Sequence, residues 1–228
     1  MLKINNLTKK FGSFVAVNKL NFEINQSGLY LFVGDNGSGK TTLFNIIAGL
    51  INPDEGNISF NNSTDADLRR KQFGISTEPF ITEPSLTVRE IAEIVQKVKH
   101  VSSEETTRLL QLWDIWIARD KPFKALSTGM KKRLSLALSM PGNPDFLLWD
   151  EPFNGLDPLG IKLLNEIILD LTEQGKTILL STHLLNEISV PSNSCFVLKE
   201  GILAGTVERD SSTNFNETIF NLLKNGKC

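Results

Sequence analysis

The sequence predicts an α/β protein with a mainly parallel sheet, and two strand–helix patterns carry this prediction. In the first, the short apolar run 29–33 is followed by apolar residues at helical spacing over 41–50. In the second, apolar strands at 146–149 and 177–180 flank a predicted helix over 160–174. Because parallel strands are joined by crossover helices, both patterns favour one buried sheet covered by helices.

Two further regions frame this core. The stretch 2–24 alternates apolar and polar residues around a turn at 11–13, which predicts antiparallel strands, and 57–60 adds another strand. Between 79 and 143 the apolar spacing is mostly helical, and a short helix is predicted at 215–224. The predicted helices of the middle region cover residues 87–99, 104–116 and 130–140.

The composition is that of an ordinary globular chain. Hydrophobic residues make up 40% and charged residues 22% of the 228 residues, and the formal net charge is −2, so no global charge favours a nucleic acid partner. Cys195 and Cys228 are too few for a disulfide framework or a zinc site. No apolar run reaches the length that spans a bilayer, so a separate protein would supply any membrane part.

Residues 34–41 read Gly-Asp-Asn-Gly-Ser-Gly-Lys-Thr and match the motif G-x-x-x-x-G-K-[ST] in full. Glycines let successive backbone N–H groups turn toward phosphate oxygens, and the following helix adds its positive end. We expect Lys40 to reach the β- and γ-phosphates, the Thr41 hydroxyl to bind Mg²⁺ and Thr42 to contact phosphate. An accidental glycine turn is the alternative, but the flanking strand and helix favour phosphate binding. The predicted loop contacts also include Asn36, Gly37, Ser38 and Gly39.

Two acids, Asp150 and Glu151, end the apolar strand that begins at Phe146. In open α/β sheets, ligands bind beyond the carboxyl ends of the strands. We expect Asp150 to hold Mg²⁺, directly or through water, and Glu151 to orient or deprotonate the attacking water. The alternative is a solvated Asp-Glu pair that opens a turn before Pro152, but the phosphate loop in the same chain favours catalysis.

The order of these motifs resembles the nucleotide-binding subunit of ATP-binding-cassette (ABC) transporters, over about residues 2–208. The most specific feature is Leu-Ser-Thr-Gly-Met at 126–130, which resembles the family's signature loop L-S-G-G-Q with two replacements. The resemblance implies that Ser127 and Gly129 contact the γ-phosphate of ATP bound by a second subunit, so that two like or unlike subunits enclose two ATP molecules. An ordinary helix N-cap at Ser127 is the alternative.

The resemblance also implies a fold, an activity and a setting. The fold is of the P-loop NTPase type: a RecA-like core with a mainly parallel sheet, an antiparallel β subdomain and an inserted α-helical subdomain. The ATPase domain would cover 1–210, with the helical subdomain at about 79–143, and a short helical tail would follow at 211–228. The implied activity is ATP hydrolysis, with ATP and Mg²⁺ bound, that drives a separate membrane permease docked around 79–99. Such a protein is cytoplasmic and peripheral on the inner face of the cell membrane, and the variant signature favours export.

Single residues take further roles from the resemblance. Phe11 matches the aromatic residue that stacks on adenine, with a core or turn Phe as the alternative, and Val17 is expected to line the same base. His183, which follows a predicted strand, matches the histidine that senses the γ-phosphate. Asp157 matches a residue that touches the opposite subunit, although a helix-capping Asp before Pro158 also fits.

Glu78 is the clearest departure from the family, which usually has Gln at this position. Its carboxylate offers an oxygen to Mg²⁺ but adds negative charge near two other carboxylates, so a metal ligand and a hinge residue both stay open. The basic run Lys-Lys-Arg at 131–133, directly after the signature loop, is expected to form a solvated face rather than a nucleic-acid patch.

Two other classes of protein share the phosphate loop. Chromosome and repair clamps insert a long coiled coil between this loop and the signature, and the stretch from Lys40 to Ser127 has no sustained heptads. Translation-associated clamps carry two cassettes in one chain, and this chain has one. A GTPase needs N-K-x-D after a strand, whereas Asn-Lys-Leu-Asn at 18–21 lacks the Asp and precedes the phosphate loop.

Overall fold

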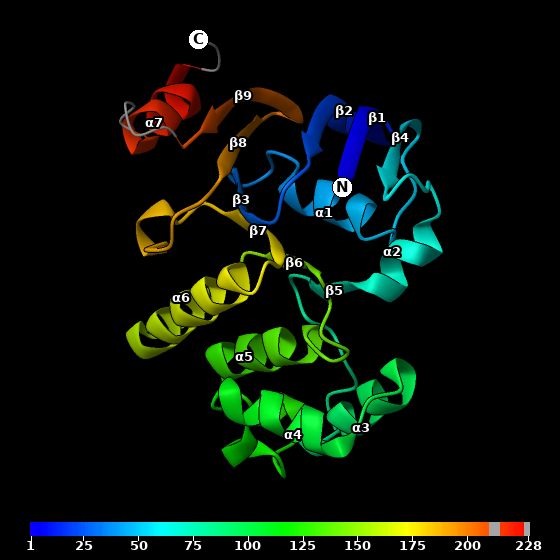
Figure 1. The fold of residues 1–228 in the computed structure, drawn as a ribbon, viewed down its shortest axis with the longest axis vertical. Coiled ribbons are helices and arrows are strands. Elements are labelled where there is room, and N and C mark those ends of the chain that lie inside the picture. The colour runs from blue at the N-terminus through cyan, green and yellow to red at the C-terminus, as the bar shows by residue number, and fades with distance from the viewer. Residues whose placement is uncertain (210–214, 226–228) are drawn as a thin grey trace.

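A computed structural model describes residues 1–209 and 215–225 and places a six-stranded sheet at the centre (Figure 1). The strand order is β5-β6-β7-β3-β8-β9, and β9 alone in this sheet runs antiparallel to its neighbour. The mainly parallel sheet predicted from the sequence is therefore confirmed, although β8 and β9 were not predicted. The bounds are β3 (Gly28–Val33), β5 (Phe73–Ser76), β6 (Phe146–Asp150), β7 (Thr177–Thr182), β8 (Ser194–Lys199) and β9 (Ile202–Glu208).

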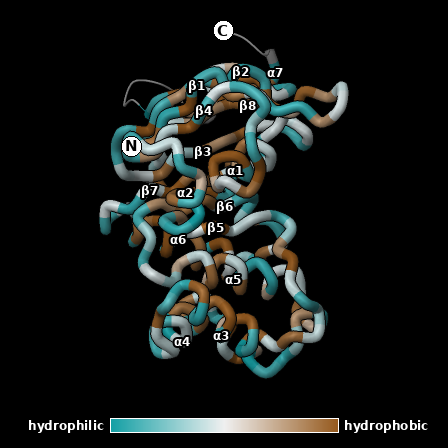
Figure 2. Tube along the Cα trace, turned by 90° about the vertical axis from the view of Figure 1, so that its right-hand side faces the viewer, coloured by the Kyte–Doolittle hydropathy of each residue, from teal (hydrophilic) through white to brown (hydrophobic). Residues whose placement is uncertain are grey.

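The two faces of this sheet bury separate hydrophobic cores. Successive side chains of a strand point to opposite faces, so along β3 Leu31 joins one core and Phe32 the other. One core packs against α1 (Lys40–Ile47), and the other packs against α6 (Pro158–Glu173). Figure 2 shows hydrophobic segments gathered in the middle of the molecule, around α1 and β3.

A smaller antiparallel sheet covers α1 on the far side from the central sheet. Its order is β2-β1-β4, with β1 (Leu2–Phe11), β2 (Phe14–Ile24) and β4 (Glu55–Phe60), which confirms the predicted hairpin and the strand near 57–60. A short helix that the sequence did not predict, α2 (Ala66–Gln72), then leads into β5.

Between β5 and β6 the chain is helical, and this part lies at the opposite end of the molecule from the antiparallel sheet (Figure 1). It contains α3 (Val88–Lys99), α4 (Ser103–Leu112) and α5 (Thr128–Ser139). Thr87 and Glu90 form a reciprocal capping box at the start of α3. The helix predicted over 104–116 stops at Leu112, because Asp114 takes a left-handed backbone with φ of 53° that an α-helix cannot contain.

The predicted terminal helix is α7 (Phe215–Asn225), which packs on β8 and β9. The predicted boundary at 210 and Cys228 lie outside the described residues, and the division into domains stays a prediction. Within residues 1–209 and 215–225, no helix combines the length and the apolar character needed to cross a bilayer.

Two tryptophans join the helical part to the central sheet. Trp113, after α4, and Trp149, on β6, are both 0% exposed, and their rings meet edge to face with centroids 6.0 Å apart. The Trp149 Nε1–H donates to the Ser139 hydroxyl at 2.9 Å, so α5 is tied to the same pair.

We expect Trp113→Ala to lower the free energy of unfolding by about 3–5 kcal/mol, because the truncation leaves a cavity between the helical part and the sheet. Urea unfolding followed by far-UV circular dichroism measures this loss. Ile117→Ala, at a side chain 81% exposed, is the matched control and should stay within about 0.5 kcal/mol of the parent. Equal losses for both variants would contradict the proposed packing role.

Candidate active site

The loop between β3 and α1 lines a cleft of about 320 Å³. Gly37 and Gly39 have φ of 81° and 102°, a region that favours glycine, and a Cβ at Gly39 would also collide with the Ala16 carbonyl oxygen. The loop therefore curls around the N-terminal end of α1, where backbone N–H groups attract anions. The predicted residues that line the cleft are Asn36, Gly37, Ser38, Gly39, Lys40, Thr41, Thr42, Glu78 and Glu151.

Lys40 is folded back into its own loop. Its side chain is 5% exposed, and Nζ donates to the carbonyl oxygens of Gly34 at 2.6 Å and Asp35 at 3.2 Å. Nζ also lies 3.4 Å from Glu151 Oε1. The loop thus holds a buried ammonium group beside the cleft, where a phosphate oxygen would compete with these acceptors.

Glu151 lies between two groups from neighbouring strand ends. One carboxylate oxygen faces Lys40, and the other lies 2.9 Å from Nδ1 of His183, which directly follows β7. The Glu151 backbone has φ of 47°, a strained value for a non-glycine residue, and its N–H donates to the Ser181 carbonyl and hydroxyl oxygens at 3.2 and 2.9 Å. The parallel pairing of β6 with β7 brings these groups together.

Asp150, the residue before Glu151, is the last residue of β6 and is 2% exposed. Its carboxylate accepts a hydrogen bond from the Ser181 hydroxyl. Burial raises the pKa of Asp150, and the hydroxyls of Ser181 and Thr41 oppose the rise without cancelling it. A cation beside the carboxylate would offset this burial penalty.

The site fits a magnesium nucleotide by two observations. The Ser38 hydroxyl is buried in the loop without a hydrogen-bond partner among the described residues, so an acceptor such as a phosphate oxygen would satisfy it. Thr41 and Asp150 offer the hydroxyl and carboxylate oxygens that Mg²⁺ prefers. Across residues 1–209 and 215–225, no group of three or more His, Cys, Asp and Glu is placed to hold a metal.

The predicted signature residues lie in a different hollow, of about 740 Å³, that shares no lining residue with the cleft. Ser127 caps α5, and its hydroxyl accepts from the Met130 N–H at 3.2 Å. Asp157 caps α6 and accepts from the Gly160 N–H and from Arg133, each at 2.9 Å, which lowers the pKa of Asp157. Both side chains therefore act as helix caps within this chain, and their roles across a dimer stay predictions.

The structure does not bring the predicted Val17 to the cleft. Val17 is fully buried in the core, whereas its neighbour Ala16 lines the cleft, because adjacent residues of a strand face opposite sides. Phe14 also lines the cleft, and Phe11, its partner across the hairpin, is 52% exposed with Lys9 Nζ 5.6 Å from its ring centroid. The prediction that Phe11 stacks on adenine stays open, with Phe14 as a second aromatic beside the cleft.

The expected solvated face at 131–133 is wrong for Lys132. Its side chain is 4% exposed and forms an ion pair with Glu78. Arg133 is 13% exposed and binds Asp114 and Asp157. Helical spacing places Lys132 on the same face of α5 as the buried Ser135 and Ser139. This periodicity could have predicted that Lys132 is buried, but the run of three basic residues favoured a solvated face.

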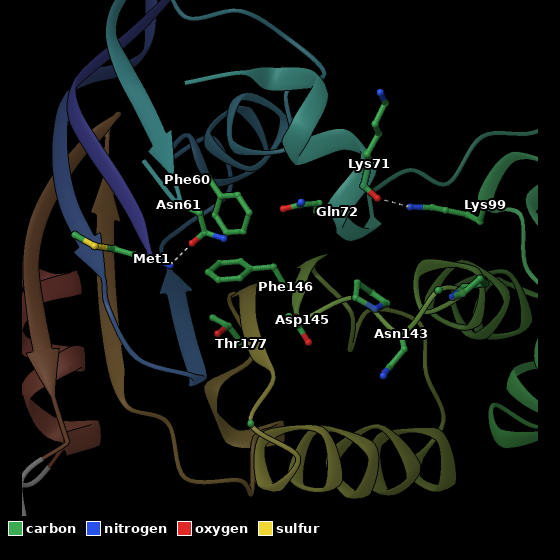
Figure 3. Close-up of a pocket in the computed structure, with 14 residues that line it drawn as sticks. Met1, Phe60, Asn61, Lys71, Gln72, Lys99, Asn143, Asp145, Phe146 and Thr177 are labelled. Atoms are coloured by element: carbon green, nitrogen blue, oxygen red, sulfur yellow. Dashed lines mark hydrogen bonds between the residues drawn. The ribbon is translucent and has the colours of Figure 1, made fainter. Parts of the chain in front are cut away.

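A larger hollow, of about 820 Å³, lies at the opposite edge of the central sheet and contains none of the predicted residues (Figure 3). Phe146 and Thr177, at the amino ends of β6 and β7, line it together with Met1 and Lys99. The Met1 amino group donates to Asn61, and Lys99 donates to the Lys71 carbonyl oxygen. Size alone therefore does not identify the active site, which the convergent polar groups at the carboxyl ends mark instead.

Comparison with known proteins decides the family. A family model described as ABC transporter matches residues 17–154, more than half of the chain. The chain belongs to the ABC transporter family. This ABC cassette is therefore an ATP-binding subunit that hydrolyses ATP, as the signature loop and the phosphate loop predicted.

Relatives of this ABC cassette match nearly its whole length. The lantibiotic transport ATP-binding protein SrtF of Streptococcus pyogenes is 35% identical over 97% of this chain and 96% of its own. The Nod factor export ATP-binding protein I of Burkholderia orbicola is 33% identical over 86% of this chain and 67% of its own. The solved dimeric structure of MJ0796, described as a bacterial ABC transporter cassette, has a TM-score of 0.80 and 27% identity over 92% of this chain and all of its own. A post-hydrolysis state of that cassette is bound to ADP and phosphate.

We expect Asp150→Asn to stabilise the nucleotide-free cassette in EDTA. The raised pKa means that the folded protein binds the Asp150 proton more tightly than the unfolded chain, so stability falls as pH rises through the folded pKa. The gain from Asn should accordingly be larger at pH 8 than at acidic pH, as urea unfolding at several pH values will show. Asp170→Asn, at an exposed position of α6, is the control, and its free energy of unfolding should stay within about 0.5 kcal/mol of the parent value. A loss of stability in Asp150→Asn would contradict the burial argument.

Proposed function

We propose that Glu151 is the general base of ATP hydrolysis in this cassette, and the position of its carboxylate between Lys40 and His183 carries the proposal. The cleft wall offers a carboxylate oxygen to a water placed beyond the terminal phosphate. His183, with a proton on both ring nitrogens, orients the carboxylate through Nδ1–H and donates to the γ-phosphate through Nε2–H, and Lys40 exchanges its loop carbonyls for phosphate oxygens. The proton removed from water passes to Glu151.

We further propose that Thr41 and Asp150 bind Mg²⁺. When bound, the ion would neutralise charge that develops on the phosphates. Ser181 holds the Asp150 carboxylate from the β7 side, and the Thr41 hydroxyl is close enough to lower its pKa. Glu78 borders the same cleft as a third oxygen donor, although it is paired with Lys132.

The working form proposed for the cassette is a dimer, formed with a like or an unlike subunit. The hollow that contains Ser127 and Gly129 is separate from the phosphate cleft, so a second chain is needed to place a signature loop on the bound nucleotide. The dimeric MJ0796 cassette supports this arrangement. Phe11 and Phe14, both more than half exposed, are proposed to flank the adenine base.

The proposed membrane partner is a separate permease on the inner face of the cell membrane, and the docking surface lies within 79–99. Ile94 and Val98 project from one face of α3 and are 49% and 70% exposed, and Ile81 is 80% exposed. Exposed apolar side chains of this size mark contact surfaces. The predicted apolar face of α3 is thus divided, with Val88 and Ile91 buried in the cassette itself.

We propose export as the direction of transport, on the basis of the export protein among the relatives and the full-length match to SrtF. A nucleoside import protein of Lactococcus lactis is also related, at 28% identity, but this chain covers 45% of its length. The permease selects the cargo.

We expect Glu151→Gln to reduce ATP turnover by at least about 100-fold, because the amide cannot accept the proton of water. ATP binding should persist and an ATP-bound dimer should accumulate, as measured by phosphate release and size-exclusion chromatography. Glu166→Gln, on the exposed face of α6, is the control and should hydrolyse ATP at the parent rate. Parent-like turnover in Glu151→Gln would falsify the assignment of the base.

We expect Ile94→Ser combined with Val98→Ser to abolish recovery of a multispanning protein with the tagged cassette from solubilised membranes. ATP binding by the isolated cassette should not change, because neither side chain lines the cleft. Phe220→Ser, at a side chain 54% exposed on α7 at the other end of the molecule, is the control. Undiminished recovery would place the docking surface elsewhere, and recovery of ribosomes or DNA would favour a soluble clamp.

A further inference from the structure

Three contacts in a row join β5 and the residues that follow it, as far as Glu78, to one face of α5, and we call this row the ladder. Gly74 lies so close to the Ser139 carbonyl oxygen that a Cβ would collide with it. Two residues on, the hydroxyls of Ser76 and Ser135 are 2.7 Å apart in the interior. Two residues further, Glu78 pairs with Lys132. The contacting residues are two apart along the strand and three to four apart along the helix, so all three contacts lie on one face of each element.

The last contact of this ladder lies at the active site. Glu78 lines the phosphate cleft and its side chain is 40% exposed, whereas the Lys132 side chain is 4% exposed. Lys132 Nζ also lies 3.4 Å from the Asp150 carbonyl oxygen, and its charge lowers the pKa of the Asp150 carboxyl as the weakest of several causes. Lys132 is thus a buried cation that contacts both Glu78 and the backbone of Asp150.

Charge explains why a lysine is needed at this position. Asp150, Glu151 and Glu78 would together place three carboxylates at a site that must accept a polyanionic triphosphate. Lys40 faces Glu151, and Lys132 faces Glu78, so two of the three carboxylates are matched by a buried ammonium group. An unmatched Glu78 would repel the nucleotide, since like charges at short range disfavour each other even with solvent screening.

We propose that Lys132 is a positioning residue for nucleotide binding, which neutralises Glu78 and holds its carboxylate at the rim of the cleft. The proposal rests on the proposed nucleotide site and concerns the charge balance of that site. Since Lys132 offsets the charge of Glu78, the Glu78 departure from the family does not by itself make the site more negative. The basic residue on α5 and the acidic residue after β5 form one functional unit.

The experiment measures the dissociation constant for ATP in EDTA, where hydrolysis is absent, on four variants of the full chain. Glu78→Gln leaves Lys132 unmatched and should tighten ATP binding about three- to tenfold, whereas Lys132→Gln leaves Glu78 unmatched and should weaken it by a similar factor. The double variant restores a neutral pair and should bind ATP like the parent. Lys132→Arg keeps the charge and should also bind like the parent.

Matched controls change the same net charge away from the cleft. Glu166→Gln and Lys162→Gln remove an acid and a base from an exposed pair on α6 and should leave ATP binding unchanged. Two single variants that shift ATP binding in the same direction, or a double variant worse than both, would show a purely structural tie and overturn the inference. Loss of ATP binding in the parent protein itself would instead contradict the proposed nucleotide site.

Discussion

The parallel pairing of β3 with β7 and of β7 with β6 is the constraint on which the active site depends. Parallel strands end at one edge, so the phosphate loop after β3, the acids of β6 and the histidine after β7 meet there although they are far apart in sequence. Each strand interior is apolar and buried on both faces, which fixes the register. The packing of the apolar strand interiors therefore positions the polar groups, which take no part in that packing themselves.

This placement gathers energetically unfavourable features at the edge of the sheet where these parallel strands end. Asp150 is buried with a raised pKa, Glu151 has a left-handed backbone, and the Ser38 hydroxyl lacks a partner among the described residues. The Asp150 carboxylate and the Ser38 hydroxyl become favourable when a cation and a triphosphate are present, since these supply the missing charge and acceptor. The core stabilises a site that is prepared for its ligand.

The sequence was informative wherever one residue type meets a strict local requirement. The glycines at 37 and 39 need positive φ, Lys40 and Thr41 follow at fixed spacing, and all were predicted together with the strand before them. Lys132 and Ala16 were missed because their roles depend on where the side chain points. On β2, a step of one residue from Val17 to Ala16 moves the side chain to the other face of the sheet. On α5, helical spacing buries Lys132, whereas the basic composition of the run favoured an exposed side chain. Asp157 and Ser127 remain ambiguous within one chain, since helix caps and anion sites use the same residue types.

The Glu78–Lys132 pair also connects parts of the cassette that act on different partners. Lys132 lies five residues after Ser127 on α5, and Glu78 lies three residues before Ile81, in the stretch proposed to face the permease. A cation bound with the nucleotide would compete with Lys132 for the Glu78 carboxylate, and this competition would change the tie between the signature helix and the permease-facing stretch. Because the remaining contacts of the ladder are buried and uncharged, they hold α5 on β5 while the ion pair responds to charge.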